Sequence, residues 1–295
     1  MTKLHLTALN ALSQAEFVSV LGPTVEHAAW IADRVAAQRP FASLAALFAA
    51  MRDVILRSDR DVRLALLRGH PELAGLAARS GSMTAESQGE QSGAGLDALS
   101  SDRARIFEEL NAAYAARHGF PFVIAVRRHG TDSILREFRR RVDEGRDAEI
   151  ETALSEILHI VALRLDATLE GDETLPVAGH LSTHVLDTHA GVPAVGVAVE
   201  LFEMPATGAP RLLGRSVTNE AGRTHAPLIA GRPVPIATYE LRFGMGDYFR
   251  ARGATLASPP FLDIVPIRFA VAEPEGRYHV PLTATPWSYA TYRGS

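Results

Sequence analysis

The spacing of hydrophobic residues changes once along the chain, near residue 170. Before that point apolar residues recur every three or four positions, as they do between residues 41 and 57, which is the spacing of an amphipathic helix. After residue 180 the period falls to two, for example at 195–201, as in a strand with one buried face. The pattern therefore predicts a helical half followed by a β half.

The helical half contains recognisable helix starts and ends. Ser13 and Glu16 have the spacing of a capping box. Gly69 and Gly119 each follow a periodic stretch, at positions where a left-handed glycine ends a helix at little cost. We expect helices over 41–57, 62–67, 102–118, 132–144 and 148–166.

Residues 81–101 interrupt this pattern. They are rich in Ser, Gly, Gln and Glu and show little periodicity. The composition fits a mobile loop, but about twenty polar residues within a helical domain also fit a functional loop.

A polar segment at 170–179 has the composition of a linker. We expect an all-α helical bundle over 1–169 and an antiparallel β-sandwich over 180–295. Its strands are expected near 181–186, 195–201, 239–243, 264–271 and 277–283, with turns at 219–222, 244–246 and 275–276.

The amino-acid composition excludes several classes of protein and of functional site. Of the 295 residues, 47% are hydrophobic and 22% charged, a balance that excludes wholesale disorder. The net charge of −4 argues against a nucleic-acid partner, and the absence of cysteine excludes disulfides and thiolate sites. No apolar run is long enough for a membrane span, and the first residues lack a signal-peptide layout, so we expect a cytoplasmic protein. The scattered histidines predict no metal site, and no glycine-rich fingerprint predicts a nucleotide cofactor.

Two residues of the helical half stand out chemically. His70 follows a predicted helix end and precedes Pro71, a position compatible with a general acid or base, although a surface capping histidine is the commoner case. Arg164 falls at the margin of an apolar helix face, where it either clamps an anion or only extends its stem along the surface.

Four segments of this half, taken in order, resemble a known family. They are HPELAG at 70–75, SQGEQSGAGL at 87–96, GFPFV at 119–123 and ALRL at 162–165. Together they resemble the decarboxylases of 2-oxo-4-hydroxy-4-carboxy-5-ureidoimidazoline (OHCU), all-helical enzymes of urate breakdown.

The resemblance implies roles for individual residues. His70 would be the catalytic histidine that delivers a proton, and Glu90 the carboxylate that raises its pKa and sets its tautomer. Arg164 would bind the anionic side of the substrate. Further substrate contacts would come from Pro71, Ser87, Gln91 and the segment from Phe120 to Ile124.

In the β half, His184 and His279 each lie within a predicted strand. Isolated strand histidines are usually structural. With Arg223 beside a predicted turn, they could instead form a hydrolytic cluster, because a guanidinium depresses imidazole pKa values and keeps a base neutral.

Five further segments resemble the transthyretin-like 5-hydroxyisourate hydrolases. They are LSTHVLDT at 181–188, GVPA at 191–194, TNEAGR at 218–223, RYHVPL at 277–282 and the terminal YRGS at 292–295. The resemblance implies that His184, Arg223, His279 and Ser295 are catalytic, and that Tyr292, Arg293 and Gly294 shape the site. Family members carry such sites at the interface of a symmetric tetramer.

Together the two resemblances predict a bifunctional enzyme of urate catabolism that needs no cofactor or metal. The β half would open 5-hydroxyisourate to OHCU, and the helical half would decarboxylate OHCU to (S)-allantoin. We expect a homotetramer built through the β half, with the helical half as a second pairing surface. Two alternatives stay open: only one half is active, or the β half is a transthyretin-type carrier joined to a helical interaction module.

Overall fold

The computed structural model describes residues 3–74, 84–97 and 99–294. The chain divides into two compact units. One contains Met1–Arg127 and Ser133–Val177, and the other contains Arg128–Asp132 and Ala178–Ser295.

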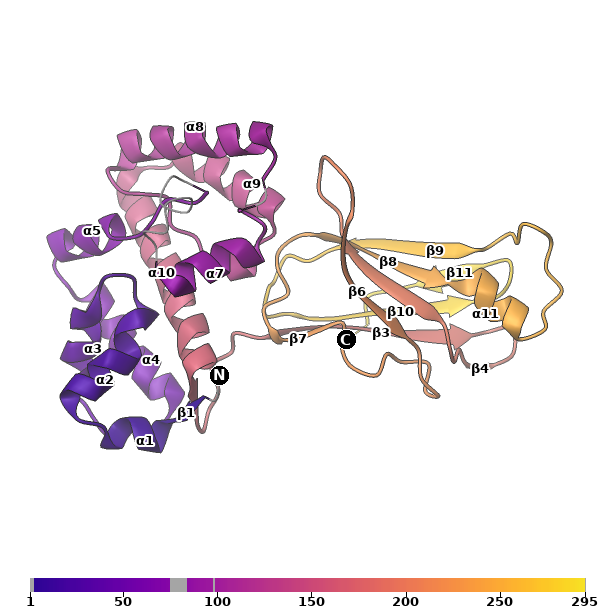
Figure 1. The fold of residues 1–295 in the computed structure, drawn as a ribbon, viewed down its shortest axis with the longest axis horizontal. Coiled ribbons are helices and arrows are strands. Elements are labelled where there is room, and N and C mark those ends of the chain that lie inside the picture. The colour runs from indigo at the N-terminus through magenta and orange to yellow at the C-terminus, as the bar shows by residue number, and fades with distance from the viewer. Residues whose placement is uncertain (1–2, 75–83, 98, 295) are drawn as a thin grey trace. The chain divides into compact units, whose positions relative to one another are not determined.

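The helical unit is built around α10, its longest described helix, which contacts α4, α5 and α8 (Figure 1). Two short strands, β1 and β2, pair in parallel, so the prediction of a purely helical domain is wrong in this detail. The elements are β1 (Leu4–His5), α1 (Leu6–Ala11), α2 (Gln14–Leu21), η1 (Gly22–Thr24), α3 (Ala29–Ala36), α4 (Leu44–Leu56), α5 (Arg60–Arg68), α7 (Ala85–Gly93), α8 (Ser101–His118), η2 (Val126–Arg128), α9 (Thr131–Val142), α10 (Arg146–Thr168) and β2 (Leu169–Glu170).

The helix ends confirm two sequence predictions and overturn one. Ser13 and Glu16 form the predicted capping box of α2. Gly119 ends α8 in the left-handed conformation, with φ 78°. Gly69 ends α5 with φ −74°, so the left-handed cap expected there is wrong.

Helix α7 forms where the pattern showed little periodicity. Thr84 caps it by accepting a hydrogen bond from the Ser87 amide, and Glu86 in the first turn complements the helix dipole. The expectation of a loop throughout 81–101 is therefore wrong for Ala85–Gly93.

The linker prediction at 170–179 covers residues that pack on the helical unit. Leu175 and Val177 are buried in the same hydrophobic core as α2, α4 and α10. The β-strand β3 already begins at Gly179.

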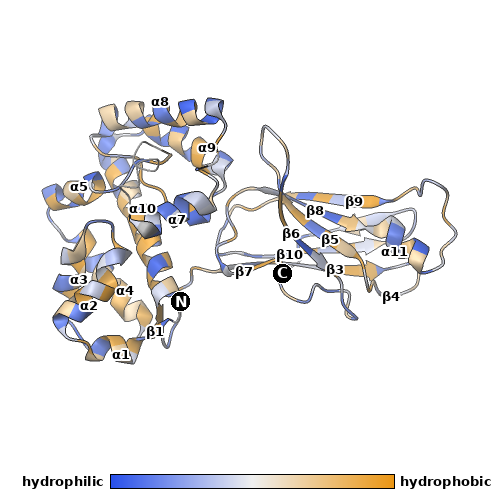
Figure 2. Ribbon diagram, viewed as in Figure 1, coloured by the Kyte–Doolittle hydropathy of each residue, from blue (hydrophilic) through white to orange (hydrophobic). Residues whose placement is uncertain are grey.

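The β unit contains two sheets that share one hydrophobic core. Strands such as β9 carry residues of both kinds (Figure 2), and on β9 Val265 and Ile267 are buried in the core between exposed neighbours. One sheet has the order β11-β10-β3-β4 with β7 also paired to β3, and the other has the order β6-β5-β8-β9. The elements are β3 (Gly179–Asp187), β4 (Val192–Pro193), β5 (Ala198–Glu203), β6 (Arg211–Val217), β7 (Ile229–Arg232), β8 (Thr238–Gly244), α11 (Met245–Ala251), β9 (Ile264–Ala270), β10 (Arg277–Ala284) and β11 (Tyr289–Thr291).

Two expectations for the β unit are wrong. Strands β3 and β10 run parallel, so the first sheet is mixed rather than antiparallel, because a period of two carries no information on strand direction. The turn expected at 244–246 is the start of α11, whose Met245 and Phe249 are buried in the core.

Candidate functional sites

The buried guanidinium of Arg164 joins three segments of the helical unit. Its Nε and Nη2 donate to the two carboxylate oxygens of Glu90 on α7, at 3.1 and 2.9 Å. Nη2 also donates to Ser87 Oγ at 3.0 Å, and Nη1 donates to the Pro23 carbonyl at 3.2 Å and to Glu26 Oε2 at 3.4 Å. A guanidinium has five N–H groups, so each has a protein acceptor.

Because the N–H groups of Arg164 already have protein acceptors, its predicted role as a substrate-binding residue has to be reconsidered. Burial works against its charge, but Glu90 and Glu26 outweigh that effect and raise its pKa, so the residue is a permanent cation. A substrate anion would have to displace a carboxylate to reach it. In this structure Arg164 orients Glu90, and direct substrate binding stays a prediction.

Glu26 is a site residue that the sequence analysis missed. Its side chain is fully buried, and it accepts hydrogen bonds from Thr84 Oγ1 at 2.8 Å and from Ser87 Oγ at 2.7 Å. Burial raises its pKa, but the hydrogen bonds from Ser87 and Thr84 and the charge of Arg164 outweigh burial and lower it. Glu26 therefore stays ionised and ties the start of α7 to Arg164. As an isolated acid between two helices, it leaves no periodic signal in the sequence.

His70 has a defined tautomer. Its Nδ1 lies 3.1 Å from the Leu66 carbonyl oxygen, which can only accept, so Nδ1 carries the hydrogen and the acceptor lone pair is on Nε2. Burial lowers the pKa of His70 to about 4, which makes the imidazole neutral at neutral pH. The expectation that Glu90 raises this pKa and sets the tautomer is wrong, because the Leu66 carbonyl sets the tautomer and Glu90 pairs with Arg164.

A small cavity brings these groups together. Pro71 and Gln91 also line this cavity. Gln91 in addition stabilises the adjacent turn, since its Oε1 accepts a hydrogen bond from the Ala74 amide at 2.9 Å. Phe120 does not line the cavity. Its ring packs on Tyr114 instead, and this corrects the expected pocket wall. The lining residues are His70, Pro71, Leu73, Ser87, Glu90, Gln91, Phe122, Val123, Ile124, Val126, Ile160 and Arg164.

A second cluster lies on the half-exposed face of the β3–β10 pair. The register pairs His184 with Pro281 and Ser182 with His279, so both histidines project from the same face two positions apart. Ser182 Oγ lies 3.0 Å from His279 Nδ1. Ser182 was not predicted as a site residue, although the period of two places it on the strand face of His184.

Arg223 reaches this cluster from the turn after β6. It forms a β-bridge with His184, and the turn is held by a hydrogen bond from the Val185 amide to the Gly222 carbonyl at 2.8 Å. Burial, followed by the charge of Arg223, lowers the pKa of both His184 and His279. His184 Nε2 is buried without a hydrogen-bond partner among the described residues.

Gly294 holds His279 in place from the other side. Its amide donates to the His279 carbonyl at 2.8 Å, and a Cβ at Gly294 would lie 2.7 Å from His279 Cδ2. Arg293 lies over the Tyr278 ring, with its Cζ 5.0 Å from the centroid, and Tyr292 is exposed. Ser295 lies outside the described residues.

Within residues 3–74, 84–97 and 99–294, no group of three or more His, Asp or Glu side chains is arranged to hold a metal ion. No helix in this described part of the chain is both long and apolar enough to cross a membrane.

Comparison with known proteins assigns each unit to a family. The profile "OHCU decarboxylase" matches residues 10–166, and the profile "HIUase/Transthyretin family" matches residues 181–294. The 5-hydroxyisourate hydrolase of Deinococcus radiodurans is 52% identical over 122 residues, which is 40% of this chain and 100% of that protein. The OHCU decarboxylase of Haloferax volcanii is 39% identical over 165 residues, 56% of this chain and 96% of that protein.

One solved structure resembles the chain as a whole. The crystal structure of (S)-allantoin synthase is 31% identical, covers 99% of this chain and 100% of its own, and gives a TM-score of 0.53. The likeness therefore extends over both units and not over one alone.

The protonation state of the His70 imidazole can be measured as a function of pH. We expect its imidazole to titrate near pH 4, against about 6.5 for an unperturbed histidine, because the buried ring resists protonation. Heteronuclear NMR across a pH series gives the midpoint, and the His70→Asn spectrum identifies the signal by its loss. A midpoint at or above the unperturbed value would contradict this account of the site.

Proposed function

The chain belongs to the OHCU decarboxylase family over residues 10–166 and to the HIUase/Transthyretin family over residues 181–294, and from this premise we propose how its residues act. It is a bifunctional enzyme of urate degradation. The C-terminal unit hydrolyses 5-hydroxyisourate to OHCU, and the N-terminal unit decarboxylates OHCU to (S)-allantoin. The observation that carries this conclusion is the likeness to (S)-allantoin synthase across both units.

In the decarboxylase site, a neutral His70 has to gain a proton before it can donate one. OHCU carries a hydroxyl and a carboxylate on the same ring carbon. We propose that Nε2 takes the hydroxyl proton while the bond to the carboxylate breaks and carbon dioxide leaves. The electron pair moves into the adjacent ring C=N bond, whose nitrogen takes up one proton from solvent. Nε2 then returns the hydroxyl proton to the neighbouring ring carbon as the hydroxyl-bearing carbon becomes a carbonyl. Protonation from one side yields a single enantiomer.

Glu90 and the apolar residues that line the cavity provide the surroundings in which this proton transfer occurs. Arg164, which also pairs with Glu26, holds the Glu90 carboxylate in one orientation, so Glu90 can accept a hydrogen bond from substrate without first reorganising. Phe122, Ile124 and the other apolar lining residues exclude water, which strengthens polar interactions within the cavity. Ser87 and Gln91 already bond to protein groups, and their contacts with substrate remain part of the proposal.

In the hydrolase site, we propose that His184 or His279 acts as general base. Their lowered pKa values keep both rings neutral near neutral pH, so each ring has one nitrogen lone pair that can accept a proton from water. The water attacks the ring carbonyl, and the nearby guanidinium of Arg223 stabilises the developing oxyanion. Tyr292, Arg293, Gly294 and Ser295 would close the site around the substrate.

We also propose that the β unit assembles into a homotetramer. Large apolar side chains stay exposed on it, including Val192, Trp287 and Tyr289. A protein–protein contact would remove such apolar side chains from water. The helical unit is a second candidate surface for pairing.

Single substitutions should separate the two activities. His70→Asn removes the proton carrier, so decarboxylation should fall by about 100-fold or more, whereas hydrolysis of 5-hydroxyisourate should not change. His279→Asn should lower hydrolysis of 5-hydroxyisourate and leave decarboxylation of OHCU unchanged. Hydroxyisourate absorbance reports the first step, and the circular dichroism of allantoin reports the second. Full decarboxylation by His70→Asn, or full hydrolysis by His279→Asn, would contradict the site assignment.

Gly294 offers a steric test of the hydrolase site. Gly294→Ala places a methyl group against the His279 ring, so the ring has to move and hydrolysis should slow by about 10-fold or more. Gly214→Ala in the same unit is the control, because no atom lies within 4 Å of a Cβ there. Steady-state kcat and KM for 5-hydroxyisourate measure the effect. Equal rates in Gly294→Ala and Gly214→Ala would show that Gly294 does not position His279.

A further inference from the structure

The apolar wall of the decarboxylase cavity is an irregular, buried stretch of main chain. Residues 121–125 have no helical or strand structure, yet Phe122, Val123, Ile124 and Ala125 are each at most 3% exposed. Buried N–H and C=O groups need partners, and here no regular structure supplies them. Side chains from neighbouring helices therefore have to define the path of this segment.

Arg141 on α9 supplies one such partner. Its Nη1 donates to the Val123 carbonyl at 3.0 Å, and its guanidinium lies over the Phe122 ring, with Cζ 4.4 Å from the centroid. Both Phe122 and Val123 line the cavity. Arg141 thus contacts two consecutive wall residues without lining the cavity itself, and its own side chain is 1% exposed.

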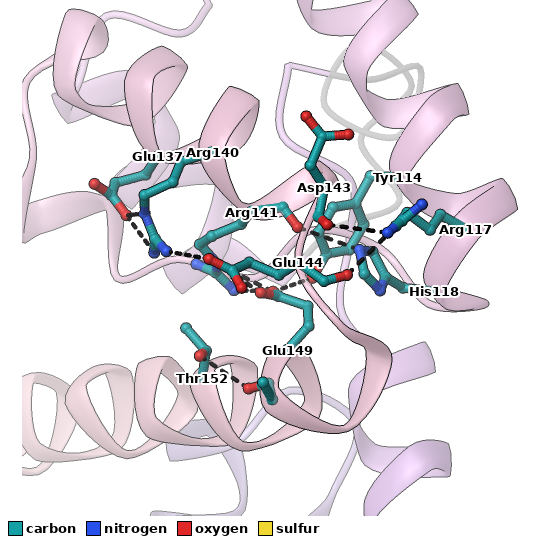
Figure 3. Close-up of polar contacts among 11 residues, drawn as sticks. Tyr114, Arg117, His118, Glu137, Arg140, Arg141, Asp143, Glu144, Glu149 and Thr152 are labelled. Atoms are coloured by element: carbon teal, nitrogen blue, oxygen red, sulfur yellow. Dashed lines mark hydrogen bonds and ion pairs between the residues drawn. The ribbon is translucent and has the colours of Figure 1, made fainter.

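Glu149 on α10 keeps the Arg141 guanidinium in this position. Arg141 Nε and Nη2 donate to Glu149 Oε1 at 3.0 and 2.5 Å, and Tyr114 also donates its hydroxyl to that oxygen (Figure 3). The Glu149 side chain is fully buried. A buried ion pair contributes little net stability compared with apolar side chains of similar volume, so stability alone does not explain this cluster.

Glu156 fixes the other end of the same stretch. From α10, its Oε2 accepts a hydrogen bond from the Ala125 amide at 2.8 Å. The Val123 carbonyl and the Ala125 amide are thus held by charged side chains of two different helices, with Ile124 of the cavity wall between them.

We propose that Arg141 and Glu156 are positioning residues for decarboxylation. They hold the main chain at 123–125 so that Phe122, Val123 and Ile124 present a fixed apolar surface to the substrate next to His70. Neither residue lines the cavity. This inference rests on the proposed function of the helical unit. A displacement of the wall by about 1 Å would be enough to lower the rate by about 100-fold.

Two adjacent arginines give a matched test. Arg141→Lys keeps the charge but loses the planar fork, so it cannot both pair with Glu149 and reach the Val123 carbonyl. Arg140→Lys is the control, because Arg140 on the same helix is exposed and forms its ion pairs within the described residues with Glu137 and Glu144 (Figure 3). We expect kcat/KM for OHCU to fall at least 10-fold in Arg141→Lys and to stay unchanged in Arg140→Lys.

The full chain provides its own folding control. Hydrolysis of 5-hydroxyisourate should be equal in both variants, and kinetics are measured well below the Tm of each protein. A merely structural role would lower Tm and leave kcat and KM of the folded enzyme unchanged, and that result would overturn the inference. A wild-type chain that does not accelerate OHCU decarboxylation would refute the proposed function instead.

Glu156 tests the inference if Arg141→Lys does not fold. Glu156→Gln retains an oxygen that can accept from the Ala125 amide, whereas Glu156→Ala does not. We expect Glu156→Ala to lose at least 10-fold in kcat/KM for OHCU and Glu156→Gln to recover most of that loss. Wild-type decarboxylation kinetics in Glu156→Ala would overturn the positioning role.

Discussion

The candidate decarboxylase site depends on one buried cation, Arg164, whose N–H groups all have acceptors in the protein. Arg164 has to be charged to hold Glu90, and it can be charged in the core only because Glu90, Glu26, Ser87 and the Pro23 carbonyl accept its N–H groups. The short helix α7 carries Glu90 and Ser87, and its start is tied to Glu26 through Thr84. A polar helix with little apolar surface is thereby fixed against α10.

The candidate site histidines of both units are held in the neutral state by similar surroundings. Burial keeps His70, His184 and His279 neutral, so each is ready to accept a proton rather than to give one. A neighbour holds one ring nitrogen, which is the Leu66 carbonyl for His70 and Ser182 for His279. The charged neighbours differ, because His70 faces a paired carboxylate whereas the strand histidines face a guanidinium. This difference fits a decarboxylation in one unit and an attack of water on a carbonyl in the other.

Sequence periodicity predicted the elements that bury an apolar face. It did not predict elements whose structure depends on polar contacts or on strand pairing. Helices α8 and α10 and strands β3 and β10 were found because their buried residues recur at a regular spacing. Helix α7 was missed because it turns polar side chains to the site, and α11 because glycines at 244 and 246 resembled a turn. The parallel pairing of β3 with β10 leaves no trace in a pattern with a period of two. Motif resemblance predicted His70 and Glu90 as site residues but not Glu26, whose link to them arises only from its contacts in three dimensions.

One chain carries both the hydrolase unit and the decarboxylase unit, so it should carry out two consecutive reactions. The most direct test is circular dichroism during the oxidation of urate by urate oxidase, with and without this protein, while the hydroxyisourate absorbance is followed in parallel. We expect accelerated loss of hydroxyisourate together with rapid growth of the signal of a single allantoin enantiomer. Loss of the absorbance without a chiral product, or no change from the spontaneous decay, would contradict it.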